Sequence, residues 1–253
     1  MSHSVATLED APPAVGSAAA PAESPRQATA ETNAAWFDDN DLYIANQSKL
    51  EHYRHCRRCV EREIKGVARL LDVGNGGFFN YDTSLIGHAT AVDLFLKDGP
   101  GPIPNTSFKA GSLLDLPFAD GSFDAILLQN VFHHVTGRTV AENYKNLRRC
   151  MGELHRCVHR DGKVVVVEST VPLWFNLFER LAYGPALKIK RGGHPVTFQF
   201  TPEELLREAG EAGFAVQEYV MIPKGAWLLQ FGRKWPAWLT PVRVVKLILG
   251  KRH

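Results

Sequence analysis

The chain has 253 residues, and its 29 basic and 27 acidic residues give a net charge of +2. This balance gives no reason to expect nucleic acid as a partner. No run of 18 apolar residues is present, which excludes a predicted transmembrane helix.

Residues 1–34 are rich in Ala, Pro and Ser and contain no aromatic residue. Such a segment cannot bury enough apolar surface to offset its ordering entropy, and we predict a disordered tail. Residues 35–253 are predicted to form a single domain. The start of the chain has no basic stretch followed by an apolar one, so we expect no secretory signal and a cytoplasmic location.

The folded part is predicted to begin with one or two helices between residues 41 and 68, after the capping cluster DDND. Five apolar runs then alternate with helical or loop segments. Near-continuous apolar runs are typical of parallel strands that are covered on both faces. The five predicted strands are 67–73, 89–95, 106–111, 123–131 and 162–170.

Three further helices are predicted at 139–158, 173–189 and 201–214, the last with Thr201 as N-cap. Two strands, 215–222 and 226–232, are predicted to form an antiparallel pair. The pattern predicts an α/β fold with a doubly wound, seven-stranded, mostly parallel sheet that is Rossmann-like and ends in an antiparallel C-terminal hairpin.

Two features leave alternatives open. HCRRC has the CxxC spacing of a zinc site, but no second pair accompanies it, and we predict no metal. The tail KWPAWLTPVRVVKLILGKRH could form an amphipathic helix on a membrane surface. We favour a tail that packs on its own domain or a partner.

The segment LLDVGNGGFF places a glycine turn directly after the first strand. Gly74, Gly76 and Gly77 allow positive φ and the close approach of a ligand to the backbone. A carboxylate at Asp72 suits a ligand with an ammonium group. Asp93, at the end of the second strand, is placed to accept hydrogen bonds from vicinal ribose hydroxyls.

The pieces LLDVGNGG, AVDLF, GSLLDLPFADGSFDAI, NVFHHV and LHRCVHRDGKVVVVE occur in this order over residues 67–170. They resemble class I S-adenosylmethionine-dependent methyltransferases, of the broad group that includes ubiquinone- and menaquinone-biosynthesis methyltransferases. The chain departs from the group's usual GxGxG pattern at Phe78, where glycine is usual.

The resemblance implies S-adenosyl-L-methionine as cofactor. Asp72 and the loop would border its methionine part, Asp93 and Leu94 its ribose and adenine, and Ser112 and Leu113 the adenine edge. The implied cofactor-binding residues are Asp72, Gly74, Asn75, Gly76, Gly77, Asp93, Leu94, Ser112, Leu113, Gln129 and Asn130.

Methyl transfer to a hydroxyl benefits from a general base, and histidine titrates near neutrality. The candidates are His133, His134 and His194, although the HH pair could be structural and His194 a turn residue. Aromatic residues make 171–200 a candidate acceptor cap, while Trp36, Phe37 and Tyr43 could form an N-terminal helical lid. Aromatics at such spacing are more often core.

The first hypothesis is methyl transfer to a hydroxyl oxygen of a small biosynthetic intermediate or secondary metabolite. The alternatives are C- or N-methylation of a quinone- or lipid-like acceptor, a non-catalytic protein that binds the cofactor, and a nicotinamide dehydrogenase. We expect a small-molecule acceptor, no nucleic acid and no stable membrane insertion, and we leave a homodimer open.

Overall fold

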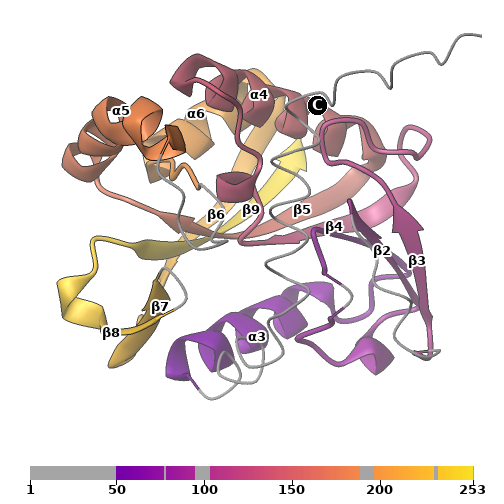
Figure 1. Cartoon of the computed structure of the whole chain (residues 1–253). Coiled ribbons are helices and arrows are strands. Elements are labelled where there is room, and N and C mark those ends of the chain that lie inside the picture. The colour runs from indigo at the N-terminus through magenta and orange to yellow at the C-terminus, as the bar shows by residue number, and fades with distance from the viewer. Residues whose placement is uncertain (1–49, 77, 95–102, 189–196, 231–232, 253) are drawn as a thin grey trace, which may run out of the picture.

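The computed structural model describes residues 50–76, 78–94, 103–188, 197–230 and 233–252. The predicted disordered tail and the N-terminal lid residues Trp36, Phe37 and Tyr43 lie outside this part. The main feature is a seven-stranded sheet in the order β3-β2-β1-β4-β5-β9-β6, with helices on both faces (Figure 1). Its strands are β1 (Arg69–Val73), β2 (His88–Asp93), β3 (Thr106–Ala110), β4 (Phe123–Gln129), β5 (Val158–Thr170), β6 (Phe214–Ile222) and β9 (Arg243–Lys251).

Strands β1 to β5 pair in parallel, and β9 is antiparallel to both of its neighbours, β5 and β6. The predicted fold class is therefore confirmed. The predicted partner of β6 was wrong. Within the predicted strand 226–232, β7 (Trp227–Gln230) pairs not with β6 but with β8 (Arg233–Pro236), in a separate two-stranded sheet.

The physical reason lies in the tail. Residues 244–249 form a fully buried run, whereas Trp227 and Trp235 in the small sheet stay partly exposed. This run is apolar except for Lys246, and a buried run that is covered on both faces belongs in the middle of a sheet. The tail thus packs as a strand of its own domain, as we favoured, and the amphipathic-helix alternative is wrong.

Helices cover the two faces of the sheet. On one face lie α4 (Val140–Cys157) and α6 (Pro202–Glu211), and on the other lies α3 (Glu51–Ile64) (Figure 1). The caps that start α4 and α6 are local: the Thr139 side chain accepts from the Glu142 amide, and Thr201 and Glu204 form a capping box. Residues of β4 and β5 alternate between the two faces, which makes two apolar layers.

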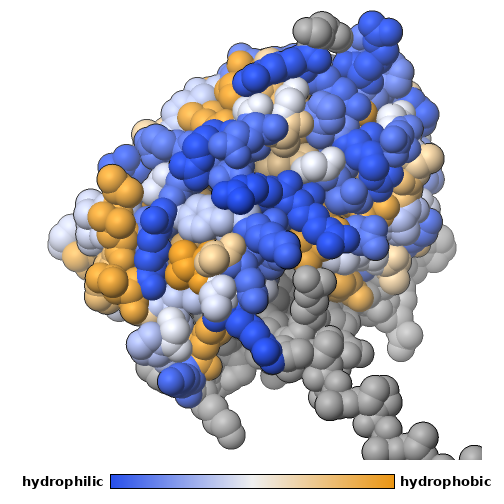
Figure 2. Space-filling view, turned by 90° about the horizontal axis from the view of Figure 1, so that it is seen from above, coloured by the Kyte–Doolittle hydropathy of each residue, from blue (hydrophilic) through white to orange (hydrophobic). Residues whose placement is uncertain are grey.

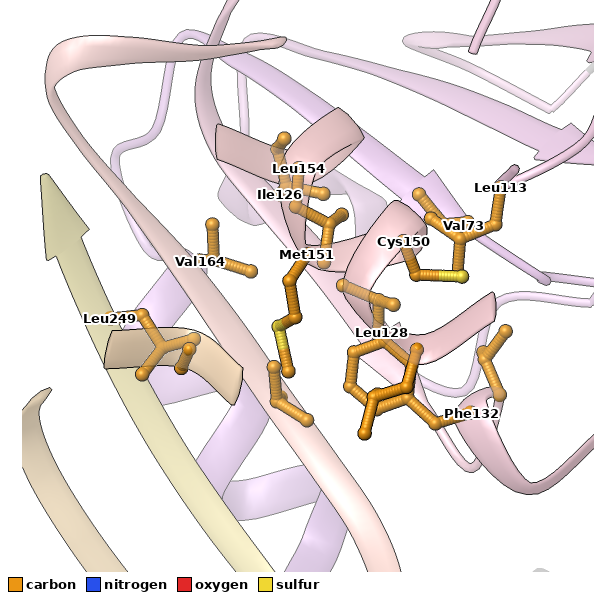
Figure 3. Close-up of a cluster of buried hydrophobic side chains, with 14 of the residues drawn as sticks. Val73, Leu113, Ile126, Leu128, Phe132, Cys150, Met151, Leu154, Val164 and Leu249 are labelled. Atoms are coloured by element: carbon orange, nitrogen blue, oxygen red, sulfur yellow. The ribbon is translucent and has the colours of Figure 1, made fainter. Parts of the chain in front are cut away.

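The layer beneath α4 is close-packed. Met151 and Leu154 of α4 lie against Ile126 of β4 and Val164 of β5, with Leu249 of β9 beside them (Figure 3). These five side chains are all buried. This layer holds β4 and β5 rigidly, and the candidate site lies where these strands end.

In its described residues, 74–76 and 78–87, the connection from β1 to β2 contains no α-helix, unlike the usual crossover of a doubly wound sheet. It has a loop and a short 3₁₀ helix, η1 (Thr83–Leu85), which the Asp82 side chain caps by accepting from the Ser84 amide. Phe79 in this loop packs against Tyr81 and Phe108, with ring centroids 5.5 and 5.7 Å apart. The loop is therefore anchored by its own aromatic side chains.

Strands β1, β2, β4 and β5 run in the same direction and end at the same edge of the sheet. We call this edge the carboxyl edge. Strand β6 is antiparallel to β9, which is antiparallel to β5, so β6 also ends at this edge. Helix α5 (Leu173–Lys188) and residues 223–242 therefore both begin at the carboxyl edge.

The cysteines carry no disulfide: Cys56, Cys150 and Cys157 are buried, Cys59 is half-buried, and all four are free. Within the described ranges, no group of three or more His, Cys, Asp or Glu residues is arranged to hold a metal ion. In the same ranges, no helix has the length and apolar character needed to cross a membrane.

Candidate functional site

The glycine loop after β1 makes a tight turn at the carboxyl edge. Gly74 and Gly76 have φ of +71° and +63°, a region that favours glycine. The Gly74 amide donates to the carbonyl of Val92, 2.8 Å away. A Cβ at Gly74 would lie 2.7 Å from a methyl group of Val131, so the position has no room for a side chain. Gly77 lies outside the described residues.

Asp72 is a buried carboxylate beneath this loop. Its Oδ2 accepts hydrogen bonds from Asn75 Nδ2 at 2.7 Å and from the Tyr81 hydroxyl at 2.9 Å. Burial raises the pKa of Asp72 to about 7, against the two donors, which lower it, and the nearby Asp93 charge raises it further. Asp72 therefore fixes the loop from inside and is only partly ionised at neutral pH.

Asp93 lies at the end of the neighbouring strand, β2. Its Oδ2 accepts from the Gly76 amide at 2.8 Å, which joins the second strand end to the glycine loop. The next residue, Leu94, is half exposed, at 51%. The backbone of Asp93 also accepts from the Gly111 amide, and this brings Ser112 and the buried Leu113 to the same edge.

The end of β4 contributes two amides. Gln129 and Asn80 exchange a pair of side-chain hydrogen bonds, at 2.8 and 3.0 Å, which holds the loop against β4. Asn130 has a φ of 58°, and its Oδ1 accepts from the Ser169 hydroxyl at 2.8 Å. The positive φ turns the chain sharply after the strand and directs the next residues across the end of β5.

Those residues form the 3₁₀ helix η2 (Phe132–His134), which sits on a buried glutamate. Glu168, 1% exposed near the end of β5, has its Oε1 2.6 Å from Nδ1 of His133. Its Oε2 accepts from the amides of Val131 and Phe132, at 3.0 and 2.8 Å. A carboxylate accepts only, so His133 donates from Nδ1 and its Nε2 is an acceptor when the ring is neutral.

The structure brings most of the predicted site residues to one edge. The cofactor candidates that are described all follow or end β1, β2, β3 or β4, and His133 and His134 follow β4 with ring centroids 4.1 Å apart. His194 lies outside the described residues. In the predicted cap, Tyr183, Phe198 and Phe200 are core residues, whereas Trp174 and Phe178 are exposed.

The predicted site residues did not include Glu168, Asn80 or Ser169. Glu168 binds His133, and the other two bind the amides at the end of β4. The available signal was position, since polar residues directly after a buried strand lie at the edge where other strands also end. Phe78, the departure from the glycine pattern, is 45% exposed beside the loop.

The comparisons with known proteins agree with this geometry. Residues 71–166 match a family described as a methyltransferase domain. The demethylmenaquinone methyltransferase of Paenarthrobacter aurescens is 30% identical in an alignment 199 residues long that covers 68% of this chain and 70% of that protein.

Two solved structures share the fold. A complex of a methyltransferase with the Trm112 methyltransferase activator of Haloferax volcanii gives a TM-score of 0.59, with 14% identity over 87% of this chain and 97% of the other. The 1,6-didemethyltoxoflavin-N1-methyltransferase of Burkholderia thailandensis, solved with S-adenosylhomocysteine, gives 0.56, with 17% identity over 93% and 94%.

The residues at the carboxyl edge fit S-adenosylmethionine. Asp72 and Asp93, on neighbouring strand ends, suit a ligand with positive charge and vicinal hydroxyls, and exposed Leu94 offers an apolar surface for a base. Asn75 Oδ1, also in the loop, is buried without a hydrogen-bond partner among the described residues. The glycine loop, the paired strand-end carboxylates and the relatives together show that the chain belongs to the class I S-adenosylmethionine-dependent methyltransferases.

Proposed function

We propose that the enzyme transfers the methyl group to a hydroxyl oxygen of a small-molecule acceptor, with His133 as general base. The observation that carries this proposal is the 2.6 Å hydrogen bond between His133 Nδ1 and the buried Glu168. A histidine oriented by a carboxylate presents its second nitrogen as a proton acceptor. A hydroxyl acceptor needs such a base, whereas an already acidic group does not.

The mechanism divides the work between these two residues. Bound S-adenosylmethionine supplies a methyl group that its sulfonium already activates. His133 Nε2 takes the hydroxyl proton as the acceptor oxygen forms its bond to the methyl carbon and the carbon–sulfur bond breaks. The Glu168 carboxylate holds the ring in the required tautomer and stabilises the imidazolium. Glu168 touches no reacting atom and is a positioning residue.

The cofactor would be held by the ends of four strands. Asp93 would accept from the ribose hydroxyls, with Leu94 against the adenine and Ser112 and Leu113 at the adenine edge. Asp72 and the loop with Gly74, Asn75, Gly76 and Gly77 would border the methionine part. Gln129 and Asn130 would line the cofactor and face towards the acceptor. The shared edge of these residues supports this arrangement.

A second candidate is methyl transfer to carbon on a quinone-like acceptor. The relative that is 30% identical is named for demethylmenaquinone, which favours this chemistry. The same His133 could then remove a proton from a hydroxyl on the ring, and electron density would reach the carbon that is methylated. The two candidates share the base and differ in the atom that receives the methyl group.

The experiment is a product assay on the full chain with S-adenosylmethionine and a panel of phenols, alcohols and a reduced demethylmenaquinone analogue. Mass spectrometry detects the gain of one methyl group, and NMR assigns it to oxygen or carbon. A methyl group on oxygen supports the first candidate; one on carbon overturns it in favour of the second.

The role of His133 is tested with H133N, with H88N as control. His88 is an exposed histidine at the start of β2, at the opposite edge, and is bonded to Ser107. We expect H133N to lower kcat by about 10²–10⁴-fold with little change in KM. A kcat equal to that of H88N would rule out His133 as the base.

A further inference from the structure

Helix α5 has its polar and apolar sides reversed. Its buried positions are Asn176 and Tyr183, and its half-buried Arg180 donates to Tyr144 and Glu204. The side turned to solvent is apolar. Its exposed side chains are Leu173 (60%), Trp174 (66%), Leu177 (48%), Phe178 (63%) and Leu181 (82%).

Spacing shows that these five side chains form one surface. Leu173, Leu177 and Leu181 follow each other at four-residue intervals, and Trp174 and Phe178 do the same one position on. No charged residue interrupts the stripe, because Glu179 and Arg180 are half-buried on the inner side. Figure 2 shows apolar surface along the left margin, where α5 lies in Figure 1, next to a largely hydrophilic centre. Large exposed apolar surfaces of this kind mark interaction sites.

A second exposed apolar element leaves the same edge of the sheet. The 3₁₀ helix η3 (Ala237–Leu239) exposes Trp238 at 82% and Leu239 at 52%. Strand topology makes α5 and the segment after β6 both start at the carboxyl edge, and α5 and β8, which directly precedes η3, project to the same side in Figure 1. We call the five α5 side chains together with Trp238 and Leu239 the apolar rim.

The sequence around the apolar rim is basic. Residues 223–243 contain four Lys or Arg residues and no Asp or Glu, and the same holds for residues 180–200. The whole chain has a net charge of only +2, so positive charge is concentrated in these two segments. Lys188, Lys234 and Arg243 are exposed in them, and Lys234 Nζ lies 4.8 Å from the centroid of the Trp227 ring.

We propose that the apolar rim docks on the surface of an anionic lipid bilayer. Segments that combine tryptophan and leucine with flanking lysine and arginine bind at the interface of such membranes. Their apolar side chains enter the interface, and their cations contact the anionic headgroups. A second copy of the chain fits less well, because a two-fold contact through the rim would bring the basic segments of the two copies together. A bilayer is also large enough to contact both elements at once.

Docking would turn the carboxyl edge, with the proposed cofactor residues and His133, towards the bilayer. The acceptor would then be a lipid-soluble molecule that enters from the membrane side. This substrate class rests on the proposed function, but the docking itself does not. The docking test therefore measures binding without catalysis.

The test is sedimentation of the full chain with vesicles of phosphatidylcholine alone or with about a quarter phosphatidylglycerol. We expect binding to the anionic vesicles that is at least about tenfold stronger and that weakens as salt rises from about 0.05 M to about 0.5 M. The variants F178E and W238E should each lower binding by about tenfold, because a charge at the interface opposes insertion.

V216E is the matched control, since Val216 is exposed near the start of β6, at the opposite edge. Retained S-adenosylmethionine binding by each variant shows that it is folded. Equal binding by F178E, W238E and V216E overturns the proposal, as does the absence of vesicle binding by the unaltered chain. A dimer in light scattering that F178E separates into monomers also overturns it, because the occupant would be a second copy.

Discussion

The two sides of the carboxyl edge are built on opposite principles. On the cofactor side, polar groups turn inward: Asp72 and Asp93 are held by the loop, and Gln129 by Asn80. On the side of α5, apolar groups turn outward, with Leu181 and Trp238 each 82% exposed. The first is an internally hydrogen-bonded cradle, and the second is a surface that lacks a partner within the described chain. Pre-organised polar groups suit a small charged cofactor, and exposed apolar groups suit a large apolar partner.

The largest expected effect belongs to E168Q. A glutamine amide facing His133 would donate to Nδ1, so the ring would carry its proton on Nε2 and could not act as a base. We expect kcat to fall by about 10²–10⁴-fold with KM nearly unchanged, as for H133N. Steady-state kinetics of the two variants measure this. A purely structural role for Glu168 predicts lost stability with an unchanged kcat of the folded fraction instead.

D72N tests how much the buried carboxylate of Asp72 lowers the stability of the folded protein. The folded-state pKa of Asp72 is raised from 3.8 to about 7, so the protonated form is favoured by folding. That stabilisation is fully present below about pH 4 and is lost as pH rises through about 7. We expect D72N, which cannot ionise, to raise the free energy of unfolding at pH 8 by up to about 4 kcal/mol and to have little effect at pH 4. Urea unfolding at both pH values measures it.

The same substitution should weaken the enzyme's hold on its positively charged cofactor. Calorimetry of the unaltered chain should show affinity for S-adenosylmethionine rising between pH 6 and pH 8, with proton release on binding, since a cation favours the ionised carboxylate. D72N should remove this pH dependence. A pH dependence that persists in D72N would mean that another group is responsible.

D93A should weaken cofactor binding by roughly 100-fold, the loss of two hydrogen bonds to a charged acceptor. D161A is the control, because Asp161 is an exposed carboxylate outside the site. Calorimetry with S-adenosylhomocysteine measures both. Equal affinities for D93A and D161A would show that the ribose contact assigned to Asp93 is wrong.

G74A should cost about 2 kcal/mol of stability. About half of this is positive-φ strain, and the rest comes from the close contact with the Val131 methyl group. In the double variant G74A/V131A the contact is removed. Its loss of stability should therefore be smaller than the sum of the losses in G74A and V131A. Thermal unfolding of the four chains gives this cycle, and strict additivity would show that Val131 does not crowd position 74.

The cofactor side could largely be predicted from the sequence because its chemistry is local. Asp72, the glycines and Asp93 occupy strand ends, and a strand end is visible as the limit of an apolar run. The His133–Glu168 contact joins residues 35 apart, and no local pattern specified it, although both residues could be placed at the same edge.

The α5 side resisted prediction because the sequence of this helix does not specify its buried side. Helix α5 is apolar over most of its circumference and lacks the clear division into two faces of α4 and α6. Only the structure shows that Asn176 lies inside and Leu181 outside. The prediction for β6 was wrong for a related reason. Two strands close in sequence favour a hairpin, but the fully buried run in β9 pairs with β6 instead.

The smallest expected effect comes from the exposed apolar side of α5. L181E places a charge on a side chain that is 82% exposed, and we expect it to change the free energy of unfolding by less than about 0.5 kcal/mol. N176L, an apolar replacement in the same helix, should cost about 1–3 kcal/mol, because it leaves the Gln199 carbonyl, 2.8 Å from Asn176 Nδ2, without its donor. Urea unfolding of the two variants measures the difference. The opposite order would mean that the apolar face of α5 is covered in the free protein, and the comparison between the two sides would then fail.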